Sequence, residues 1–468
     1  MPDLRQTRTF LNLAAGETIA RALAFVAMLV VARRLGPAMY GVIGVTSGIM
    51  LYLNQIADAG VELAGVPAVA RQRDRLSELV SSVLSGRVLL AGVLTALVVV
   101  VGLFAFPQPD GAILAIYSLG LVFVALGTRW VFLGLQQASW VAAARISGEL
   151  TALALIVITL GGVGDVAVVP VAAVIGLAVA TCAMLFGLRG LGVHPRLTSD
   201  REASRTLFAR GPHLVGFTLL GLVLFNADLI YLRFVAGQSA AGYYAAAYTF
   251  IAFAANLSVA WAHSVMPTMA RYERTDTGRN DVYETSMLLA YTVALPVAVG
   301  GILTATPLIR LVFGGDYAPA VPALVWLLPA VPIAAVREIA VVGLIGTEGG
   351  ERRLVRINAI CAAFNIAILI PVVPVYGLIG AAVVTVLTEI LRLTIAFRFA
   401  VEAGYRPPGV VRFAKPTLAA GAMVPALTLL GDRPFPLLLT VGAAVYAGVL
   451  LVTGVLRFRA PFAVRLVV

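Results

Sequence analysis

Five arginines lie well inside long apolar stretches of this chain, away from their ends, where a charge is costly unless it faces water, a ligand or an opposite charge. They are Arg21, Arg87, Arg129, Arg337 and Arg392. A guanidinium suits an anionic group such as a phosphate, because its planar fork donates two parallel hydrogen bonds and stays ionised in a partly desolvated cavity. We therefore predict that Arg21, Arg87 and Arg337, together with Asn54, bind an anionic substrate.

These arginines also have a structural interpretation. Arg337 adjoins Glu338, so the two could form an ion pair within the protein. Glu17 precedes Arg21 by one helical turn and could neutralise it in the same way. Arg129 is shallow enough for its long side chain to extend to the membrane surface. The residue types alone leave both interpretations open.

Acidic side chains inside the apolar stretches form a second candidate set. Asn54, Asp58 and Glu62 follow one another at intervals of four, so they share one face of a helix. We predict that Glu17, Asp58 and Asp228 line a cleft or couple transport to an ion. Hydrogen bonding between neighbouring helices is the structural alternative, since polar residues in membrane bundles commonly serve that purpose.

The stretches that carry these residues have the length of membrane-spanning helices. A hydrocarbon core of roughly 30 Å requires about 20 apolar residues. We place fourteen spans at 10–32, 40–64, 79–106, 111–135, 141–162, 166–188, 208–232, 241–264, 282–305, 321–346, 354–372, 376–400, 414–430 and 437–456. The sequence therefore predicts an all-α polytopic membrane protein with about 14 transmembrane helices.

Basic residues are distributed unevenly between the two sides of these spans. One set of ends and gaps holds 24 arginines and lysines, and the other set holds 5. Loops rich in arginine and lysine stay in the cytoplasm, so both termini and every even-to-odd gap are predicted to lie there. In this orientation all five arginines inside the spans lie roughly 9 to 17 Å from a cytoplasmic span end. This depth predicts a cationic basin open to the cytosol.

Similar residues recur about two hundred positions apart. Gly36 and Gly41 match Gly237 and Gly242 at an offset of 201. Chance is one explanation, because glycine is common at span ends. The other is duplication, and the even number of spans between the copies then gives parallel repeats with the substrate path between them. We predict two pseudo-symmetric six-helix lobes around a central cleft, at 1–206 and 207–412, and a C-terminal helix pair at 413–468.

Composition and short gaps exclude several classes of protein. The chain is 60% hydrophobic and 12% charged. A water-soluble protein of this composition would have too few polar residues to cover its surface. The net charge of +11 is explained by arginines in short cytoplasmic loops, so we expect no nucleic-acid partner. The gaps contain no P-loop and no HExxH motif, and Cys182 and Cys361 lie far apart. We expect a protein that is not an enzyme and that needs neither a cofactor nor a metal.

The stretch ARRLGPAMYG at 32–41 resembles the start of polysaccharide-export flippases in the multidrug/oligosaccharidyl-lipid/polysaccharide (MOP) exporter superfamily. The run DAG at 58–60 and the run YGLIGAA at 376–382 are similar to that family too. The chain departs from the pattern at Ala38 and Met39, where relatives often carry an acidic residue. The resemblance extends over essentially the whole chain, including its short loops.

This resemblance implies a function and a set of partners. The family moves a polyprenyl-pyrophosphate-linked oligosaccharide across the bacterial cytoplasmic membrane by alternating access, for surface polysaccharide biosynthesis. The implied partners are the lipid-linked oligosaccharide, membrane lipids, a glycan polymerase and other polysaccharide-assembly proteins. A cation-coupled multidrug antiporter of the same superfamily is the alternative, because seven acids lie inside the spans beside the five arginines. A transport-inactive scaffold for glycan-assembly enzymes is a third hypothesis.

Reporter fusions test the predicted topology. Fusions at Arg75 and Tyr405 should report a cytoplasmic location, and fusions at Gln108 and Asp316 an external one, because the arginine-rich gaps are retained inside. The measurement is the paired activity of a reporter that works only in the cytoplasm and one that works only outside. A cytoplasmic signal from the gap between the last two spans would contradict the count of fourteen.

Overall fold

The computed structural model describes residues 4–71, 73–196, 198, 202–269, 277–345, 347–431, 433–459 and 463–466. The chain divides into two compact units, Met1–Ile230 and Tyr231–Val468. The boundary falls inside one continuous helix, α9 (Glu202–Ala236), so this helix contributes residues to both units. The division by lobes at 1–206, 207–412 and 413–468 stays a prediction.

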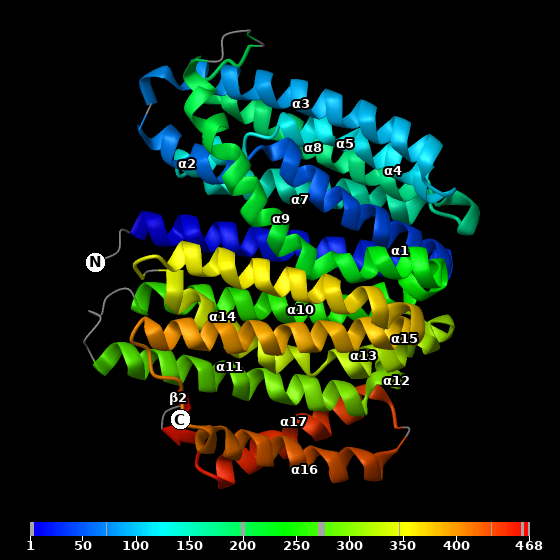
Figure 1. Cartoon of the computed structure of the whole chain (residues 1–468), viewed down its shortest axis with the longest axis vertical. Helices are drawn as coiled ribbons and strands as arrows, with labels where there is room; N and C mark the ends of the chain where they lie inside the picture. The colour runs from blue at the N-terminus through cyan, green and yellow to red at the C-terminus, as the bar shows by residue number, and fades with distance from the viewer. Residues whose placement is uncertain are drawn as a thin grey trace. The chain divides into compact units, whose positions relative to one another are not determined.

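The first unit consists of helices joined by short connections (Figure 1). They are α1 (Leu4–Asp58), α2 (Val61–Arg71), η1 (Arg73–Arg75), α3 (Leu76–Ala105), α4 (Asp110–Ser118), α5 (Gly120–Ala125), α6 (Arg129–Gly134), α7 (Ala138–Thr159), η2 (Val163–Asp165), α8 (Val168–Gly190) and the first part of α9. Small residues let neighbouring helices approach closely. A β-carbon on Gly148 of α7 would lie 2.6 Å from the carbonyl oxygen of Gly176 in α8.

The second unit continues from the end of α9. Its elements are α10 (Gln238–Met269), α11 (Thr277–Leu303), α12 (Ala305–Val312), η3 (Gly315–Ala320), α13 (Val321–Leu327), α14 (Ala330–Ile345), α15 (Gly350–Glu402), η4 (Val410–Phe413), α16 (Ala414–Leu430), α17 (Phe435–Val452), β1 (Leu456–Arg459) and β2 (Ala463–Leu466). The strands β1 and β2 pair antiparallel in a short hairpin that the sequence did not predict. Every element of this unit before the hairpin is helical.

The span count depends on where long helices are broken. Among the described residues, eleven helices are long and apolar enough to cross a membrane, and a pair bent by 45° at Pro329 makes up to twelve. Two of the eleven contain 57 and 53 residues. A straight helix of that length would extend roughly 80 Å, far beyond a hydrocarbon core of about 30 Å. Counting each of these two as two passes brings the number of spans close to the predicted fourteen, and the predicted all-α membrane fold is confirmed.

Both long helices are broken at a glycine with positive φ. Gly36 in α1 has φ 71° and ψ 175°, and Gly377 in α15 has φ 55° and ψ −133°. Side chains with a β-carbon rarely adopt such backbone angles, whereas glycine adopts them readily. Pro37 follows Gly36 and lacks a donor for the helix. Gly237, between α9 and α10, also has a positive φ of 92°. Its match to Gly36 at an offset of 201 therefore extends from residue type to a positive φ.

Apolar packing fixes the short helix α6, whose first residue is Arg129. Trp130 is 1% exposed, and Phe132 is fully buried against α3 and α8. In the second unit, Tyr446 of α17 donates a hydrogen bond to the backbone oxygen of Thr292 in α11 at 2.7 Å. Each Å² of apolar surface removed from water stabilises the fold by about 25 cal/mol. The burial of these large side chains therefore fixes the helices that carry the charged groups described below.

Replacing Gly36 with alanine should weaken the fold, because the added β-carbon clashes with its own backbone at this φ and ψ. The expected cost is about 1–3 kcal/mol. The measurement is the midpoint of thermal unfolding of the purified protein in detergent. Gly92→Ala is the matched control, since Gly92 lies in the helical interior of α3 with open space around it. Equal midpoints for the two variants would contradict the strain at Gly36.

Candidate functional site

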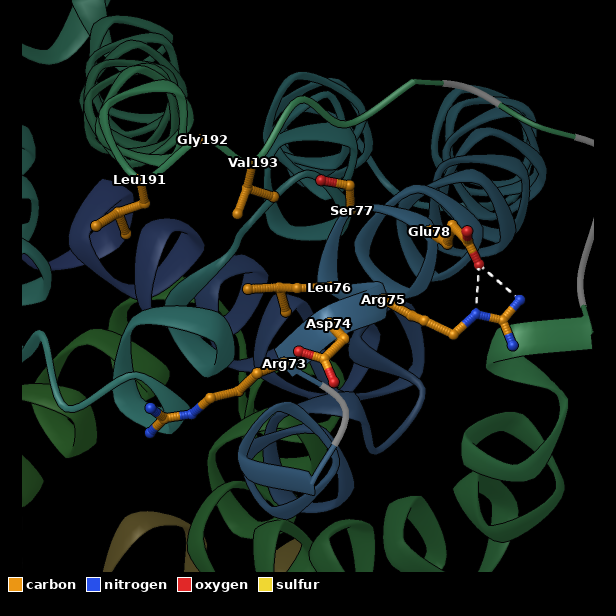
Figure 2. A pocket seen from close by; sticks show the side chains of 9 residues that line it. All are labelled: Arg73, Asp74, Arg75, Leu76, Ser77, Glu78, Leu191, Gly192 and Val193. Carbon is orange, nitrogen blue, oxygen red and sulfur yellow. Dashed lines mark hydrogen bonds and ion pairs between the residues drawn. The ribbon is translucent and has the colours of Figure 1, made fainter.

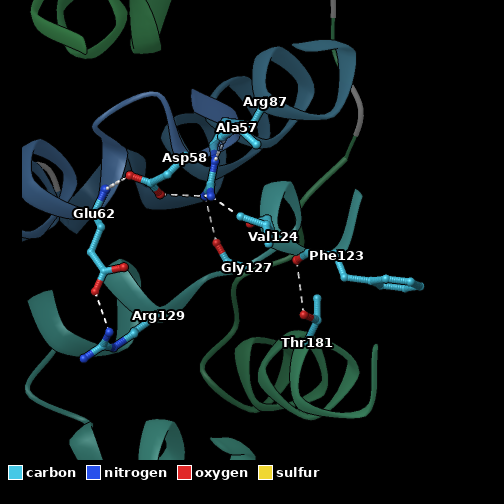
Figure 3. A network of polar contacts seen from close by, with 9 residues as sticks. All are labelled: Ala57, Asp58, Glu62, Arg87, Phe123, Val124, Gly127, Arg129 and Thr181. Carbon is cyan, nitrogen blue, oxygen red and sulfur yellow. Dashed lines mark hydrogen bonds and ion pairs between the residues drawn. The ribbon is translucent and has the colours of Figure 1, made fainter. Parts of the chain in front are cut away.

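Arg87 of α3 forms a buried clamp in the first unit and is 2% exposed (Figure 3). Its Nη2 donates to Asp58 Oδ1 at 3.0 Å and to the backbone oxygen of Val124 at 2.7 Å. Its Nη1 donates to the backbone oxygen of Gly127 at 3.0 Å, and its Nε to that of Ala57 at 3.4 Å. Carbonyl groups at the end of a helix lack partners within the helix. Arg87 therefore joins the end of α1 and the end of α5 to α3.

Asp58 takes part in this clamp from the end of α1. Its Oδ2 accepts a hydrogen bond from the backbone N–H of Glu62 at 3.1 Å, in the first turn of α2. A carboxylate at this position satisfies an N–H group that the helix itself leaves without a partner. The structure thus brings the predicted residues Asp58 and Arg87 together. In this arrangement both side chains are engaged by protein groups.

A second buried group lies in the second unit, on α14 and α15. Arg337 is 3% exposed and donates through Nε to Glu389 Oε2 and through Nη1 to Glu338 Oε1, both at 2.8 Å. Arg392 Nη1 donates to Glu389 Oε1 at 2.7 Å. Two positive and two negative charges balance within this quartet. The Arg337 guanidinium is therefore neutralised by carboxylates of its own unit.

A third group is more open and forms a chain of alternating charges across four helices. Its members are Glu62 of α2, Arg129 of α6, Glu17 of α1, and Arg145 and Glu149 of α7. The Arg129 and Arg145 side chains are 35% and 42% exposed, in contrast to 3% for Arg87 and Arg337. We call these five residues the charge chain.

The ion pairs within the charge chain differ in length. Arg129 Nη1 lies 2.7 Å from Glu62 Oε1, a close contact that Figure 3 shows. Arg129 Nη2 lies 3.3 Å from Glu17 Oε1, and Arg145 Nε lies 3.8 Å from Glu17 Oε2. Arg145 Nη2 lies 3.9 Å from Glu149 Oε1. Charge-assisted hydrogen bonds are usually about 2.7–2.9 Å long. Glu17 and Arg145 are therefore only loosely paired.

The other predicted site residues lie on α1 and α9. Arg21 is exposed and lies one helical turn after Glu17. Asn54 is partly buried on the second half of α1. Asp228 of α9 is 3% exposed, and its Oδ1 accepts a hydrogen bond from the backbone N–H of Leu229 at 2.8 Å. The roles assigned to these residues from the sequence stay predictions.

Sequence reasoning missed Arg145, which it assigned to the flank of a cytoplasmic gap. A signal was present, because Arg145 and Glu149 stand at i and i+4 on one helix. The pairing of Arg145 with Glu17 depends on the packing of α7 against α1, which the sequence does not show. Arg129 was interpreted as a side chain extending to the surface, whereas the structure pairs it with Glu17 and Glu62.

A small cavity of about 280 Å³ lies between the start of α3 and the residues after α8 (Figure 2). Two of its four charged lining residues, Arg75 and Glu78, pair with each other, and Arg75 Nε donates to Glu78 Oε2 at 2.8 Å. Both side chains are largely exposed, at 76% and 60%. Within the described part of the chain, no group of three His, Cys, Asp or Glu side chains is placed to hold a metal ion. The charge chain is therefore the stronger candidate site.

Comparison with known sequences identifies two relationships. A family model described as polysaccharide biosynthesis protein matches residues 7–273. The probable flippase AglR of Haloferax volcanii is 28% identical over 239 residues, which are 48% of this chain and 49% of that protein. The chain thus matches about half the length of this curated relative.

Solved structures of two membrane transporters share the fold. The lipid II flippase MurJ, in an inward closed conformation, aligns with a TM-score of 0.75 at 15% identity over 94% of this chain and 98% of that one. An inward-facing multidrug resistance transporter of the MATE family and MOP superfamily aligns with a TM-score of 0.64 at 13% identity over 84% and 97%. Identities this low show the fold alone.

Arg87→Gln should destabilise the first unit, because Asp58 and the carbonyl groups of Val124 and Gly127 lose a shared donor. Breaking a buried ion pair from one side costs roughly 3–5 kcal/mol. The readout is the midpoint of thermal unfolding in detergent. Arg75→Gln is the control, since an exposed pair such as Arg75 with Glu78 contributes about 0–1 kcal/mol. An Arg87→Gln protein that unfolds at the wild-type temperature but no longer transports would instead support Arg87 as a substrate ligand.

Proposed function

The chain belongs to the polysaccharide biosynthesis protein family, and from this membership we propose that it is a flippase for a lipid-linked saccharide. The substrate is a polyprenyl-pyrophosphate-linked oligosaccharide, moved across the bacterial cytoplasmic membrane for surface polysaccharide biosynthesis. The names of two similar proteins support the proposal, since one is a probable flippase and the other a lipid II flippase.

The observation that carries the proposal is the loosely paired, partly exposed arginines of the charge chain. Arg129 lies in the candidate span Asp110–Gly134, which consists of α4, α5 and α6, and Arg145 lies in the candidate span Ala138–Thr159. Arginine binds a pyrophosphate through two parallel charge-assisted hydrogen bonds and stays ionised away from bulk water. Arg21, on the same helix as Glu17, adds a third guanidinium. We propose that these three residues receive the pyrophosphate while the polyprenyl tail stays in lipid.

Arg87 and Arg337 have a different role in this proposal. Their guanidinium groups are buried and already engaged by carboxylates or carbonyl oxygens of the same unit. Releasing either group would leave a buried charge without a partner, which costs several kcal/mol. We therefore propose Arg21, Arg129 and Arg145 as the first contacts of the substrate. Asn54 remains a candidate for a contact with the sugar.

A cation-coupled multidrug antiporter is the rival function. The fold shared with a MATE-family transporter and the buried carboxylate of Asp228 favour it. An antiporter needs an acid inside the membrane that exchanges its cation, and Asp228 has that location. Under the flippase proposal, Asp58 and Asp228 serve as structural or ion-coupling groups.

The proposal includes a location and partners. The chain crosses the inner membrane many times, and both of its termini lie in the cytoplasm. It moves its substrate by alternating access. Membrane lipids surround it, and a glycan polymerase with other polysaccharide-assembly proteins acts on its product. These assignments follow from the proposed substrate and from the positive-inside distribution of arginine.

Deletion of the gene separates the two functions. A flippase deletion should abolish an exported polysaccharide and accumulate its lipid-linked precursor in the inner leaflet, because the substrate can no longer cross. The measurements are surface glycan by immunoblot and precursor by mass spectrometry of extracted lipids. Unchanged glycan with increased sensitivity to cationic drugs would assign the protein to the antiporters.

Replacing Arg21 tests the proposed chemistry in the complemented deletion strain. Arg21→Lys should lower glycan export several-fold despite keeping the charge, and Arg21→Gln should lower it roughly tenfold or more, since a hydrogen bond to a charged group contributes about 1.5–3 kcal/mol. Arg398→Gln is the control, because its side chain is 80% exposed and outside the proposed site. If Arg21 only neutralises a nearby carboxylate, Arg21→Lys, which keeps the positive charge, should export at the wild-type level at matched expression. Wild-type export by Arg21→Lys would remove Arg21 from the binding site.

A further inference from the structure

Glu17 lies between two guanidinium groups in the first unit. Its Oε1 is 3.3 Å from Arg129 Nη2 and its Oε2 is 3.8 Å from Arg145 Nε. Each carboxylate oxygen thus faces a different arginine, and the two arginines come from different helices. Because a carboxylate has two oxygens, one Glu17 side chain can hold both cations.

The contacts of Glu17 are poor for a permanent ion pair. Both distances exceed the usual length of a charge-assisted hydrogen bond, about 2.7–2.9 Å. Glu17 Oε1 and Arg129 Nε are shielded from solvent, and neither makes a hydrogen bond to the residues that the structure describes. The buried quartet of the second unit contrasts with this, because its three ion pairs are 2.7–2.8 Å long. Glu17 neutralises its arginines without satisfying their hydrogen bonds.

Both arginines have a second carboxylate that remains when Glu17 moves. Glu62 holds Arg129 through Nη1 at 2.7 Å, and Glu149 lies 3.9 Å from Arg145 Nη2. Arg129 Nε and Nη2, which face away from Glu62, form the edge of the guanidinium that binds an anion side-on. Arg21, one turn after Glu17 on α1, supplies a cation on the same side of the helix.

We propose that Glu17 is a displaceable internal counter-ion, and that a diphosphate exchanges with its carboxylate between Arg129 and Arg145. The inference rests on the proposed function and names the group that competes with the substrate. A diphosphate has oxygens on two phosphorus atoms, so it can bridge two guanidinium groups and supply acceptors that a single carboxylate lacks. No covalent bond forms or breaks in this exchange.

Competition by Glu17 has a consequence for transport. The arginines would bind the diphosphate more tightly if Glu17 were absent. The observed affinity is lower because part of the binding free energy is used to displace the Glu17 carboxylate. When the substrate leaves, Glu17 returns to the arginines and assists release. Removing its charge should therefore tighten binding and slow turnover, because stronger binding of a state before the transport step does not accelerate that step.

Binding of inorganic pyrophosphate to the purified full-length protein tests the exchange. The protein is placed in phosphatidylcholine nanodiscs and studied by isothermal titration calorimetry. Glu17→Gln should bind pyrophosphate about tenfold more tightly than wild type, which corresponds to roughly 1.4 kcal/mol. Arg129→Gln and Arg145→Gln should each bind at least about tenfold more weakly. Replacing part of the lipid with phosphatidylglycerol distinguishes a site for diphosphate from a site for any phosphate. At a general anion site the phospholipid phosphate would compete, and the measured affinity for pyrophosphate would fall.

Glu284→Gln is the matched control for the loss of one carboxylate. Its side chain is 20% exposed, as is that of Glu17, and it pairs with Arg412 at 2.7 Å in the second unit. Its affinity for pyrophosphate should equal that of wild type. If Glu17→Gln does not fold, Glu17→Asp, which keeps the charge on a shorter side chain, should give an intermediate gain in affinity.

Equal or weaker pyrophosphate binding by folded Glu17→Gln, or an equal gain in Glu284→Gln, would overturn the exchange. Such a result leaves the glycan phenotype of the gene deletion unaffected, so the proposed function would stand. Conversely, an intact glycan in the deletion strain would reject the flippase while the competition measured in nanodiscs remained. In the complemented strain, Glu17→Gln should also reduce the maximal rate of export while lowering the substrate level that gives half of it.

Discussion

An ionised side chain in hydrocarbon must find an opposite charge or enough hydrogen-bond partners, and this constraint orders the polar interior of both units. Arg87 meets it with one carboxylate and three backbone carbonyl groups. Arg337 meets it with two carboxylates from neighbouring positions of α14 and α15. In each case the charge also joins different helices. The requirement to neutralise a charge thereby becomes a source of tertiary structure.

The same constraint distinguishes structural groups from candidate functional ones. A buried arginine with short contacts to several acceptors is stable where it lies, and moving it is costly. Arg129 and Arg145 are neutralised too, but across longer distances and with access to solvent. A transporter must hold a charged substrate and then release it. Loose neutralisation by Glu17 provides a resting partner that a substrate anion can replace, whereas a saturated clamp does not.

The fold could be predicted because every backbone polar group in lipid needs a hydrogen-bond partner within its own helix. The lengths of the apolar stretches and the positions of helix-breaking residues are therefore enough to locate the helices. The break at Gly36 was visible as a glycine followed by a proline, and the pairing of Arg337 with Glu338 as adjacent residues. The clamp between Arg87 and Asp58 was not visible, because the two lie 29 residues apart on different helices. The charge chain was hidden for the same reason, since its pairs depend on which helix faces meet. A single sequence records which charges need partners but not which partners they find.

The abrupt break at Gly36 restricts how this part of the chain can change in length. One residue with positive φ separates the two halves of α1, so no loop absorbs an insertion or deletion before the second half begins. Adding one residue between Gly36 and Asp58 would turn all that follows by about 100° and shift it by about 1.5 Å. Asp58, with the first turn of α2 that follows it, would then move away from Arg87. Homologous chains should therefore differ here by substitution at constant length, with their insertions confined to longer connections such as the one between α8 and α9.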